Sequence, residues 1–347
     1  MKMALITTGL VVITFLLLLF WMAGGLQLPK RTQLKPLAID TNSEGNVKSS
    51  TTSISALSWN IAWAYGQGSE GSGKRKSPEQ MKKHLLEISN HIMEINADIV
   101  LLQEVDFDSD RSYNVDQAAF IAKKAGYQYL VRGESWSANY LPFPYWPPSE
   151  HWGQIVSGGA ILSKLPIQDC EITLLPKPAA QSFFYRQFYL FRYLMRCEVS
   201  WQGRTLSIFN THLEAFDLTN REKQTELVTK ILSETSEKPS ILGGDFNTVP
   251  REAKNQHAYP DEPETDHRND RTLQILMTNS DLQEAAAQLP TPSVEERYTF
   301  PATEPNRQLD HFFNSPQVQA VDFEVSNKTC RASDHLPILS RFVFLEE

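Results

Sequence analysis

Cysteine is scarce in this chain of 347 residues, which has only Cys170, Cys197 and Cys330. Three scattered cysteines are too few for a disulfide framework and do not have the spacing of a zinc site. A basic excess is also missing, because the formal net charge is −8 and no long Lys/Arg block relieves it. Non-specific nucleic-acid binding depends on a basic face that neutralises phosphates, so the overall charge disfavours a polyanionic substrate. The sequence has no internal repeat, and its length allows one large domain or two small ones.

The first long apolar run, ALITTGLVVITFLLLLFWMA at residues 4–23, contains no charge. Its length matches a helix that crosses a bilayer, and the lack of a polar side argues against a core helix. We expect residues 1–25 to be a retained signal anchor or, alternatively, a cleaved signal peptide in which Ala23 and Gly25 are the small residues before the cut. The protein would then be single-pass in a membrane, with an extracytoplasmic domain, or secreted. Lys30, Arg31 and Lys35, just after the apolar run, favour the opposite orientation, with the domain inside the cytoplasm, because basic flanking residues tend to stay on the cytoplasmic side.

The segment that follows, residues 26–53, is polar and poor in large apolar side chains, and we expect a linker. The domain should occupy residues 54–347. Short runs such as ISALSWNI, ADIVLLQEV, TLSIFNTHL and PSILGGDF have the β-branched or aromatic content of strands.

Helix signals interrupt these strands. Ser77 to Gln80 reads as a capping box with proline at the first helical position, and it predicts a helix toward Asn96. Thr219 and Glu222 predict a second capped helix, and two more helices are expected over 115–125 and 272–279. Many strands with a few long helices indicate sheets packed together with helices outside, an α/β sandwich.

Polar side chains occur where several of the predicted strands end. They are Asn60, Glu104, Asn210, His212, Asp245, Asn247, Asp310, Asp334 and His335. Taken singly, such a residue most often closes a turn or completes a core hydrogen bond. Taken together, they would place carboxylates, amides and imidazoles around one opening. Hard oxygen ligands suit Mg²⁺ or Mn²⁺, and imidazoles can transfer protons, so the set fits metal-assisted hydrolysis of a phosphoester.

The motifs LSWNIA, LLQEVD, NTHLE, GGDFNTVP, QLDHFF and SDHLPI have the order and spacing of the endonuclease/exonuclease/phosphatase superfamily, which the chain resembles from about Ile54 to Phe344. The resemblance implies the deoxyribonuclease-I-like fold, a four-layer αββα sandwich with its site at the strand C-termini. It also implies residue roles. Glu104 would bind Mg²⁺ with Asn60 nearby, and Asp334 would lie beside the metal or His335. His335 would activate water and be oriented by Asp310. His212 would contact the scissile phosphate or assist the leaving group, while Asp245 and Asn247 would position phosphate and nucleophile.

The substrate is not decided by the fold. Residues 139–153 should form an irregular proline-rich loop, and residues 181–196 are expected to be a strand hairpin or an aromatic rim that touches lipid or a base. Because the N-terminus is apolar and the body acidic, we favour a phospholipid or sphingolipid headgroup, and SGGAILSKLPI resembles sphingomyelinases. The alternatives are an extracytoplasmic nuclease acting on DNA or RNA and a non-catalytic membrane scaffold. Arg221 would face the site or solvent. No protein partner is inferred.

Overall fold

The computed structural model describes residues 2–24, 28–40, 52–67, 75–235, 237–290, 293–326 and 331–345. Two seven-stranded sheets pack face to face. The first contains, in order, β1 (Arg31–Leu34), β7 (Ile167–Leu174), β8 (Tyr193–Trp201), β9 (Arg204–His212), β10 (Ser240–Asp245), β12 (Asp310–Asn314) and β11 (Gln283–Glu284). The second contains β13 (Val318–Val325), β14 (Ile338–Phe344), β3 (Ile54–Asn60), β4 (Ile99–Asp106), β6 (Gly153–Ser163), β5 (Tyr129–Leu141) and β2 (Leu37–Ala38).

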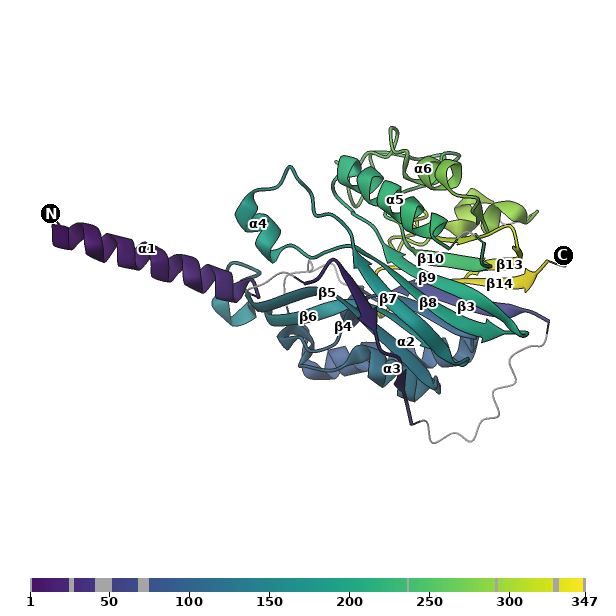
Figure 1. Ribbon diagram of the computed structural model, residues 1–347, viewed down its shortest axis with the longest axis horizontal. Helices are drawn as coiled ribbons and strands as arrows, with labels where there is room; N and C mark the ends of the chain where they lie inside the picture. Colours follow the sequence, from purple (N-terminus) through teal and green to yellow (C-terminus); the bar gives the residue numbers. More distant parts are fainter. Residues whose placement is uncertain are drawn as a thin grey trace.

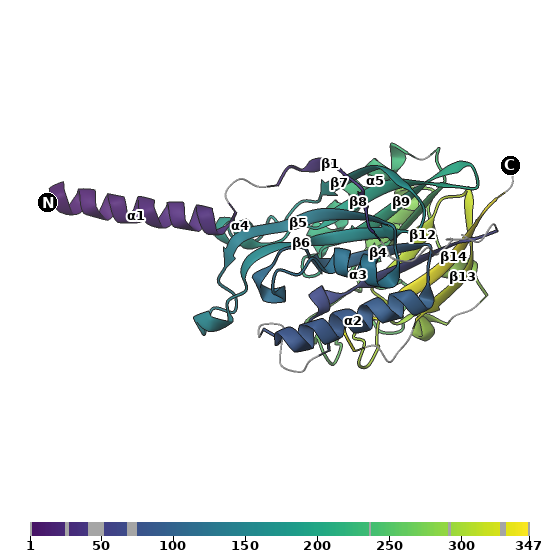
Figure 2. The same cartoon turned by 90° about the horizontal axis from the view of Figure 1, so that it is seen from below.

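Helices cover both outer faces of this pair of sheets (Figures 1 and 2). They are α2 (Pro78–Ile95) and α3 (Gln117–Ala125) on the second sheet, and α5 (Leu218–Ser233) and α6 (Thr272–Asn279) on the first. Short 3₁₀ turns occur at Ala62–Ala64, Asp110–Ser112, Pro148–Glu150, Ala286–Gln288 and Val294–Arg297. Buried apolar clusters fill each interface between neighbouring layers. The predicted α/β sandwich with helices outside is therefore confirmed.

The helix starts show how far local sequence decides the structure. α2 begins as predicted, since Ser77 Oγ accepts a hydrogen bond from Gln80 N (3.2 Å) and Gln80 Oε1 accepts one from Ser77 N (3.0 Å). α6 occupies the predicted residues. The predicted cap of α5 was wrong, because Asp217 comes earlier and its carboxylate accepts from Asn220 N at 2.9 Å. The carboxylate of Asp217 is as good a capping acceptor as the hydroxyl of Thr219, two residues later.

Two segments differ from the sequence-based expectation. Part of the expected linker forms edge strands, since β1 pairs with β7 and β2 with β5. Arg31 adds a bidentate ion pair with Glu171, at 2.7 and 2.8 Å. The expected strand hairpin over 181–196 is partly wrong, because residues Phe183–Phe188 form the helix α4 and the strand begins only at Tyr193.

The apolar N-terminal run forms the helix α1 (Lys2–Met22), which projects from the body (Figure 1). Most of its described side chains are exposed, with Leu10 at 60% and Leu17 at 63%. The helix end meets β5, where Asn139 Nδ2 donates to the Trp21 carbonyl at 2.8 Å. Within the described residues, no helix combines the length and the apolarity needed to cross a membrane. The prediction of a helix is confirmed, and the prediction of a membrane span is not.

Candidate active site

Strand direction brings the polar strand ends to one edge of the sandwich. β3 and β4 are parallel neighbours, and so are β9 and β10, so Asn60, Glu104, His212 and Asp245 lie at or near the ends of adjacent parallel strands. β12 is antiparallel to β10, and its first residue, Asp310, pairs directly with Asp245. β14 is antiparallel to β3 in the same way, so the loop before β14, which carries His335, reaches the same edge.

Unusual backbone conformations occur at this edge. Glu104 has φ +53° beside a bulge in the pairing of β4 with β6, and Asn247 has φ +51°. A non-glycine residue in this conformation costs on the order of 1–3 kcal/mol and is found where function requires a particular side-chain direction. Gly244 permits close contact with β9, because a Cβ there would lie 2.0 Å from the Thr211 carbonyl oxygen. The chain therefore accepts local strain in order to present this edge.

A cleft of about 420 Å³ opens at the edge. Six of the residues singled out from the sequence line it, namely Glu104, His212, Asp245, Asn247, Asp334 and His335. Two more, Asn60 and Asp310, are buried behind them and reach them by hydrogen bonds. The structure thus brings together all eight residues to which the resemblance assigned roles.

Asn60 connects two of the carboxylates. Its Nδ2 donates to Glu104 Oε1 at 3.1 Å and to Asp245 Oδ2 at 2.9 Å, while its Oδ1 accepts from Ala62 N at 3.0 Å. Both ends of the amide are therefore used within the protein. In this arrangement Asn60 positions the carboxylates, and Glu104, with 39% of its side chain exposed, offers the more accessible ligand atoms.

His335 and Asp310 form a buried pair in which His335 Nδ1 lies 2.9 Å from Asp310 Oδ2. Burial opposes a charge on the ring, but the carboxylates of Asp310 and Asp245 outweigh it and raise the pKa of His335 to about 10. Asp310 Oδ1 is buried and has no hydrogen-bond partner among the described residues. The pair therefore fixes Nδ1 of the ring and leaves Nε2 for water or substrate.

His212 and Asp245 have the opposite shifts. Burial, with the charges of Arg192 and His335, lowers the pKa of His212 well below its ordinary value. Burial raises the pKa of Asp245 to about 6, and the negative charge of Asp310 adds to the rise. The positive charge of His335 lowers this pKa but does not outweigh the two. His212 is therefore neutral, and because Arg192 Nη1 donates to its Nε2, its proton is on Nδ1.

The donor set fits a divalent cation that prefers oxygen. Ligand atoms of Asp245, Asp310 and His335 all lie within 4.8 Å of one another, and Glu104 shares the Asn60 amide with Asp245. An unpartnered oxygen on Asp310, in a cluster of buried carboxylates, is a place where a cation would supply the missing charge.

Two residues considered from the sequence serve the fold instead. Asn210 is buried between the sheets, where its Oδ1 accepts from Gln103 Nε2 at 2.7 Å and its Nδ2 donates to the Leu102 carbonyl at 2.9 Å. Arg221 neither lines the cleft nor faces solvent. It is 2% exposed and forms an ion pair with Asp270 at 2.8 Å.

Sequence reasoning missed Arg192 and Tyr193, which also line the cleft. Both come at the start of β8, whose hairpin with β9 turns at Gln202 and Gly203. Counting back from that turn pairs Tyr193 with His212, so an x-Gly hairpin signal could have found them.

Comparisons with known proteins agree with this geometry. The model of the Endonuclease/Exonuclease/phosphatase family matches residues 57–335. Among solved structures, an endonuclease/exonuclease/phosphatase from Beutenbergia cavernae has a TM-score of 0.62 at 20% identity, covering 84% of this chain and 72% of that one. The mannosyl-6-phosphatase of Bacteroides thetaiotaomicron has a TM-score of 0.55 at 16% identity, covering 84% and 100%. TDP2 of D. rerio, complexed with single strand DNA product, has 0.55 at 17% identity, covering 84% and 98%. No curated protein matches.

Proposed function

Because the chain belongs to the endonuclease/exonuclease/phosphatase family, we propose that it hydrolyses a phosphate ester with Mg²⁺ or Mn²⁺ bound in the cleft. The observation that carries the proposal is that Glu104, Asp245, His212 and His335 line one cleft, with two carboxylates bridged by Asn60. Acid, imidazole and amide groups in one water-accessible space are the components that this reaction requires.

The roles of the residues follow from their contacts. Glu104 and Asp245 would hold the cation, and Asp334 lies on the same wall. A bound divalent cation would supply charge stabilisation and acidify a water molecule. Asp310 orients His335, whose Nε2 lies 3.7 Å from Asp245 Oδ2. For His335 to accept a proton from water, the effect of the carboxylates on its pKa must be offset by bound positive charge. The family resemblance, not a contact in the structure, assigns Asn247 and His212 to the phosphate, since Asn247 Nδ2 donates to the Leu213 carbonyl at 3.0 Å and Arg192 Nη1 donates to His212 Nε2.

The charges of the cleft favour a substrate with a single phosphate group over a polyanion. Within the described part of the chain, no lysine lines the cleft. Arg111 is paired with Asp106 at 2.8 Å, and Arg307 with Asp261 at 2.7 Å. These cations are neutralised within the protein and cannot form the positive track that a nucleic-acid backbone needs.

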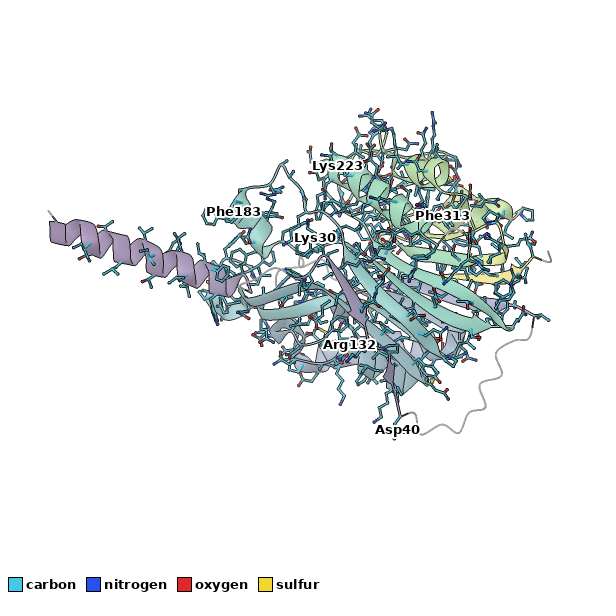
Figure 3. All side chains as sticks on the ribbon, in the orientation of Figure 1. Lys30, Asp40, Arg132, Phe183, Lys223 and Phe313 are labelled. Carbon is cyan, nitrogen blue, oxygen red and sulfur yellow. The ribbon has the colours of Figure 1, made fainter. Side chains whose placement is uncertain are left out.

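Exposed aromatic side chains support a lipid as the source of that phosphate. Phe216 is 83% exposed and lines the cleft, and Tyr145 and Trp146 are 79% and 80% exposed. Phe183, 63% exposed, lies on α4 at the end of the body from which α1 projects (Figure 3). Aromatic rings of this kind are favoured at membrane interfaces. We therefore propose a phospholipid or sphingolipid headgroup as the substrate.

Attachment to a membrane through the N-terminal segment is part of the same proposal. The exposed apolar side chains of α1 are its support, because such a surface is unfavourable in water. The proposal places the domain outside the cytoplasm, anchored or, if the segment is removed, secreted. Fractionation of cells that express the full chain tests it, and recovery of the uncleaved chain in the soluble cytoplasmic fraction would contradict it.

A nuclease is the second candidate. The D. rerio structure with a similar fold contains a single strand DNA product, and exposed rings can stack on unpaired bases. A substrate panel decides between the candidates. Sphingomyelin and phosphatidylinositol vesicles, plasmid DNA and single-stranded DNA would each be incubated with Mg²⁺ and with chelator. We expect Mg²⁺-dependent hydrolysis of a lipid, whereas cleavage of DNA without cleavage of lipid would establish the nuclease.

A further inference from the structure

His267 is a buried histidine of the cleft wall that the proposed reaction does not use. It is 5% exposed and lies in the loop between β10 and α6. Its Nδ1 lies 3.4 Å from Asp270 Oδ2, and its backbone N donates to the Gln256 carbonyl at 2.7 Å. Asp270 Oδ2 also accepts from Arg221 Nη2 at 2.8 Å and from Thr248 Oγ1 at 2.6 Å. The imidazole is therefore held by a carboxylate that is itself fixed.

This arrangement leaves the second ring nitrogen for the cleft. A carboxylate paired with an arginine only accepts hydrogen bonds, so Nδ1 of His267 carries a hydrogen that points to Asp270. Asp270 lines a separate hollow of about 430 Å³, and His267 lies between that hollow and the cleft. The Nδ1 edge of the ring thus faces away from the cleft. Nε2, which has no hydrogen-bond partner among the described residues, is on the edge toward it.

The wall around His267 carries further hydrogen-bonding groups. Thr265 and Glu262 line the cleft in the same loop, and Thr265 Oγ1 donates to Glu262 Oε2 at 3.2 Å. Glu262 also pairs with Arg307 at 2.9 Å, and 42% of its side chain is exposed. Donors and acceptors without an excess of positive charge suit hydroxyl groups, because a hydroxyl both donates and accepts. A hydroxyl can therefore pair with Nε2 in either protonation state of the ring.

Another part of the cleft wall disfavours a common lipid headgroup, choline. The rings of Trp63, Trp136 and Trp152 surround the guanidinium of Arg111, whose carbon lies 4.5, 5.2 and 4.6 Å from their centroids. Arg111 also pairs with Asp106 at 2.8 Å. Aromatic cages of this kind bind quaternary ammonium groups such as choline. Here the protein's own cation fills the cage, so a trimethylammonium group finds it occupied.

We propose that His267, positioned by Asp270, hydrogen-bonds a hydroxyl of the organic group attached to the phosphate and so selects a polyol or sugar headgroup over choline. The inference rests on the proposed function and narrows the headgroup of its substrate. Nε2 of His267 makes the selective contact, and Thr265 and Glu262 offer partners to neighbouring hydroxyls. A site built to pair with a hydroxyl rejects a group that lacks one, because its own polar atoms are then left unpaired.

Two substitutions at position 267 test the contact. His267→Asn keeps an amide donor near the place of Nδ1, for Asp270, and removes the atom at Nε2. His267→Gln reaches the place of Nε2 and can still pair with a hydroxyl. The readout is the ratio of kcat/KM for phosphatidylinositol vesicles to that for phosphatidylcholine vesicles, with Mg²⁺ and the full chain.

We expect the wild type to prefer phosphatidylinositol. The preference should fall by roughly threefold to tenfold in His267→Asn, the range for one neutral hydrogen bond, and be largely kept in His267→Gln. His257→Asn changes an exposed histidine outside the cleft and should leave the preference unchanged.

The ratio separates recognition from a structural role, because a folding defect lowers the hydrolysis of both lipids alike. Equal losses on the two lipids in His267→Asn, or a wild type that prefers phosphatidylcholine, would overturn the inference. A soluble pair of substrates, mannose 6-phosphate and phosphocholine, identifies the source of the hydroxyl. Preference for mannose 6-phosphate that depends on His267, without hydrolysis of phosphatidylinositol, would support the contact and assign it to a soluble sugar phosphate.

Binding measurements distinguish a failure of this inference from a failure of the proposed function. Calorimetry with Mg²⁺ would compare inositol 1-phosphate with phosphocholine. Tighter binding of inositol 1-phosphate that His267→Asn abolishes, without hydrolysis of any phosphoester, would support the contact and sink the proposed function. Hydrolysis of a phosphoester with equal binding of the two ligands would support the proposed function and overturn the contact.

Discussion

Two clusters of buried charge in this molecule differ in how completely their polar atoms are paired. Around Asp270, Oδ2 accepts from Arg221 Nη2 (2.8 Å) and Thr248 Oγ1 (2.6 Å), and Oδ1 accepts from Thr272 N (2.9 Å). At the cleft, the unpaired atoms among the described residues are Asp310 Oδ1, which lies behind the wall, and Trp152 Nε1, Arg192 Nε, Tyr193 OH and Arg307 Nε in the wall. We call the first set, Asp270, Arg221, Thr248 and Thr272, the Asp270 brace. In this brace both carboxylate oxygens of Asp270 are paired and only the neutral hydroxyl Thr272 Oγ1 lacks a partner, whereas beside the cleft a carboxylate oxygen is unpaired and is left for a ligand.

The two clusters are connected, which explains why both are buried. Arg221 also donates to the carbonyls of Glu214 and Ala215, just after His212, and Thr248 directly follows Asn247. The Asp270 brace thus holds the two loops that carry cleft residues. Burial opposes the ionised form of Asp270, but its partners outweigh it and lower the pKa of this carboxyl well below its usual range. The Asp270 carboxylate stays ionised and paired at neutral pH, whereas the cleft has unpaired polar atoms that can bind a ligand.

Removal of divalent cations should have the largest effect. If the unpaired cleft oxygens hold a cation, excess chelator should abolish hydrolysis and Mg²⁺ or Mn²⁺ should restore it. Glu104→Gln should raise the Mg²⁺ concentration needed for half-maximal activity. Thermal unfolding should change little with chelator, because both carboxylate oxygens of Asp270 in the brace already have hydrogen-bond partners. Full activity in excess chelator would show that the cleft needs no metal.

Replacement of the cleft histidines should come next. His335→Ala and His212→Ala should each lower turnover by roughly 10²–10⁴-fold, the range for general acid–base groups, with folding intact. His257 is exposed and outside the cleft, so His257→Ala is a matched control that should keep activity. A folded His335→Ala variant with near wild-type turnover would remove that residue from the mechanism.

Breaking the Asp270 brace should affect stability instead. Asp270→Ala leaves Arg221 buried and unpaired, and a buried charge without its partner costs about 3–5 kcal/mol of unfolding free energy. Glu222→Ala breaks the more exposed pair with Arg271 and should cost only about 0–1 kcal/mol. Urea unfolding of both variants measures the difference. Equal stability of the two would contradict the structural role of the brace.

The proline-rich loop of residues 139–153 should give the smallest effect, and only on a bilayer. Tyr145→Ser with Trp146→Ser removes two exposed rings, each worth on the order of 1.5–3 kcal/mol when buried in an interface. Hydrolysis of vesicle substrate should therefore fall at least about tenfold in apparent affinity, while a small soluble phosphodiester is hydrolysed as before. Equal losses on both substrates would indicate that the loop is structural.

Sequence alone predicted the strand-end residues of the cleft well, for a physical reason. Parallel strands end at one edge, so Asn60, Glu104, His212 and Asp245 could be grouped without knowing the packing of the sheets. What it missed depends on pairing between distant segments. The edge strand β1 exists only because it pairs with β7. Arg192 and Tyr193 reach the cleft from the start of β8, and no polar residues after a predicted strand end pointed to them.

Local signals also failed where two of them compete. Asp217 displaced the predicted cap of α5 because both candidate caps can accept the same kind of backbone hydrogen bond. The aromatic run at 183–188 has strand composition, yet Ser182 accepts from Tyr185 N at 3.2 Å and caps a short helix instead. A capping hydrogen bond thus outweighed composition in this exposed segment.

The most direct test of the distinction between the two clusters is a paired measurement on Asp310→Asn. The substitution keeps the size of a fully buried side chain and removes one charge from a crowded acidic cluster. If the cleft carboxylates serve chemistry, Mg²⁺-dependent hydrolysis of a phosphodiester should fall by roughly 10²-fold or more, while the melting temperature should fall less than in Asp270→Ala, because an amide oxygen can still accept a hydrogen bond from His335 Nδ1. A variant that is less stable than the wild type but equally active would contradict the account.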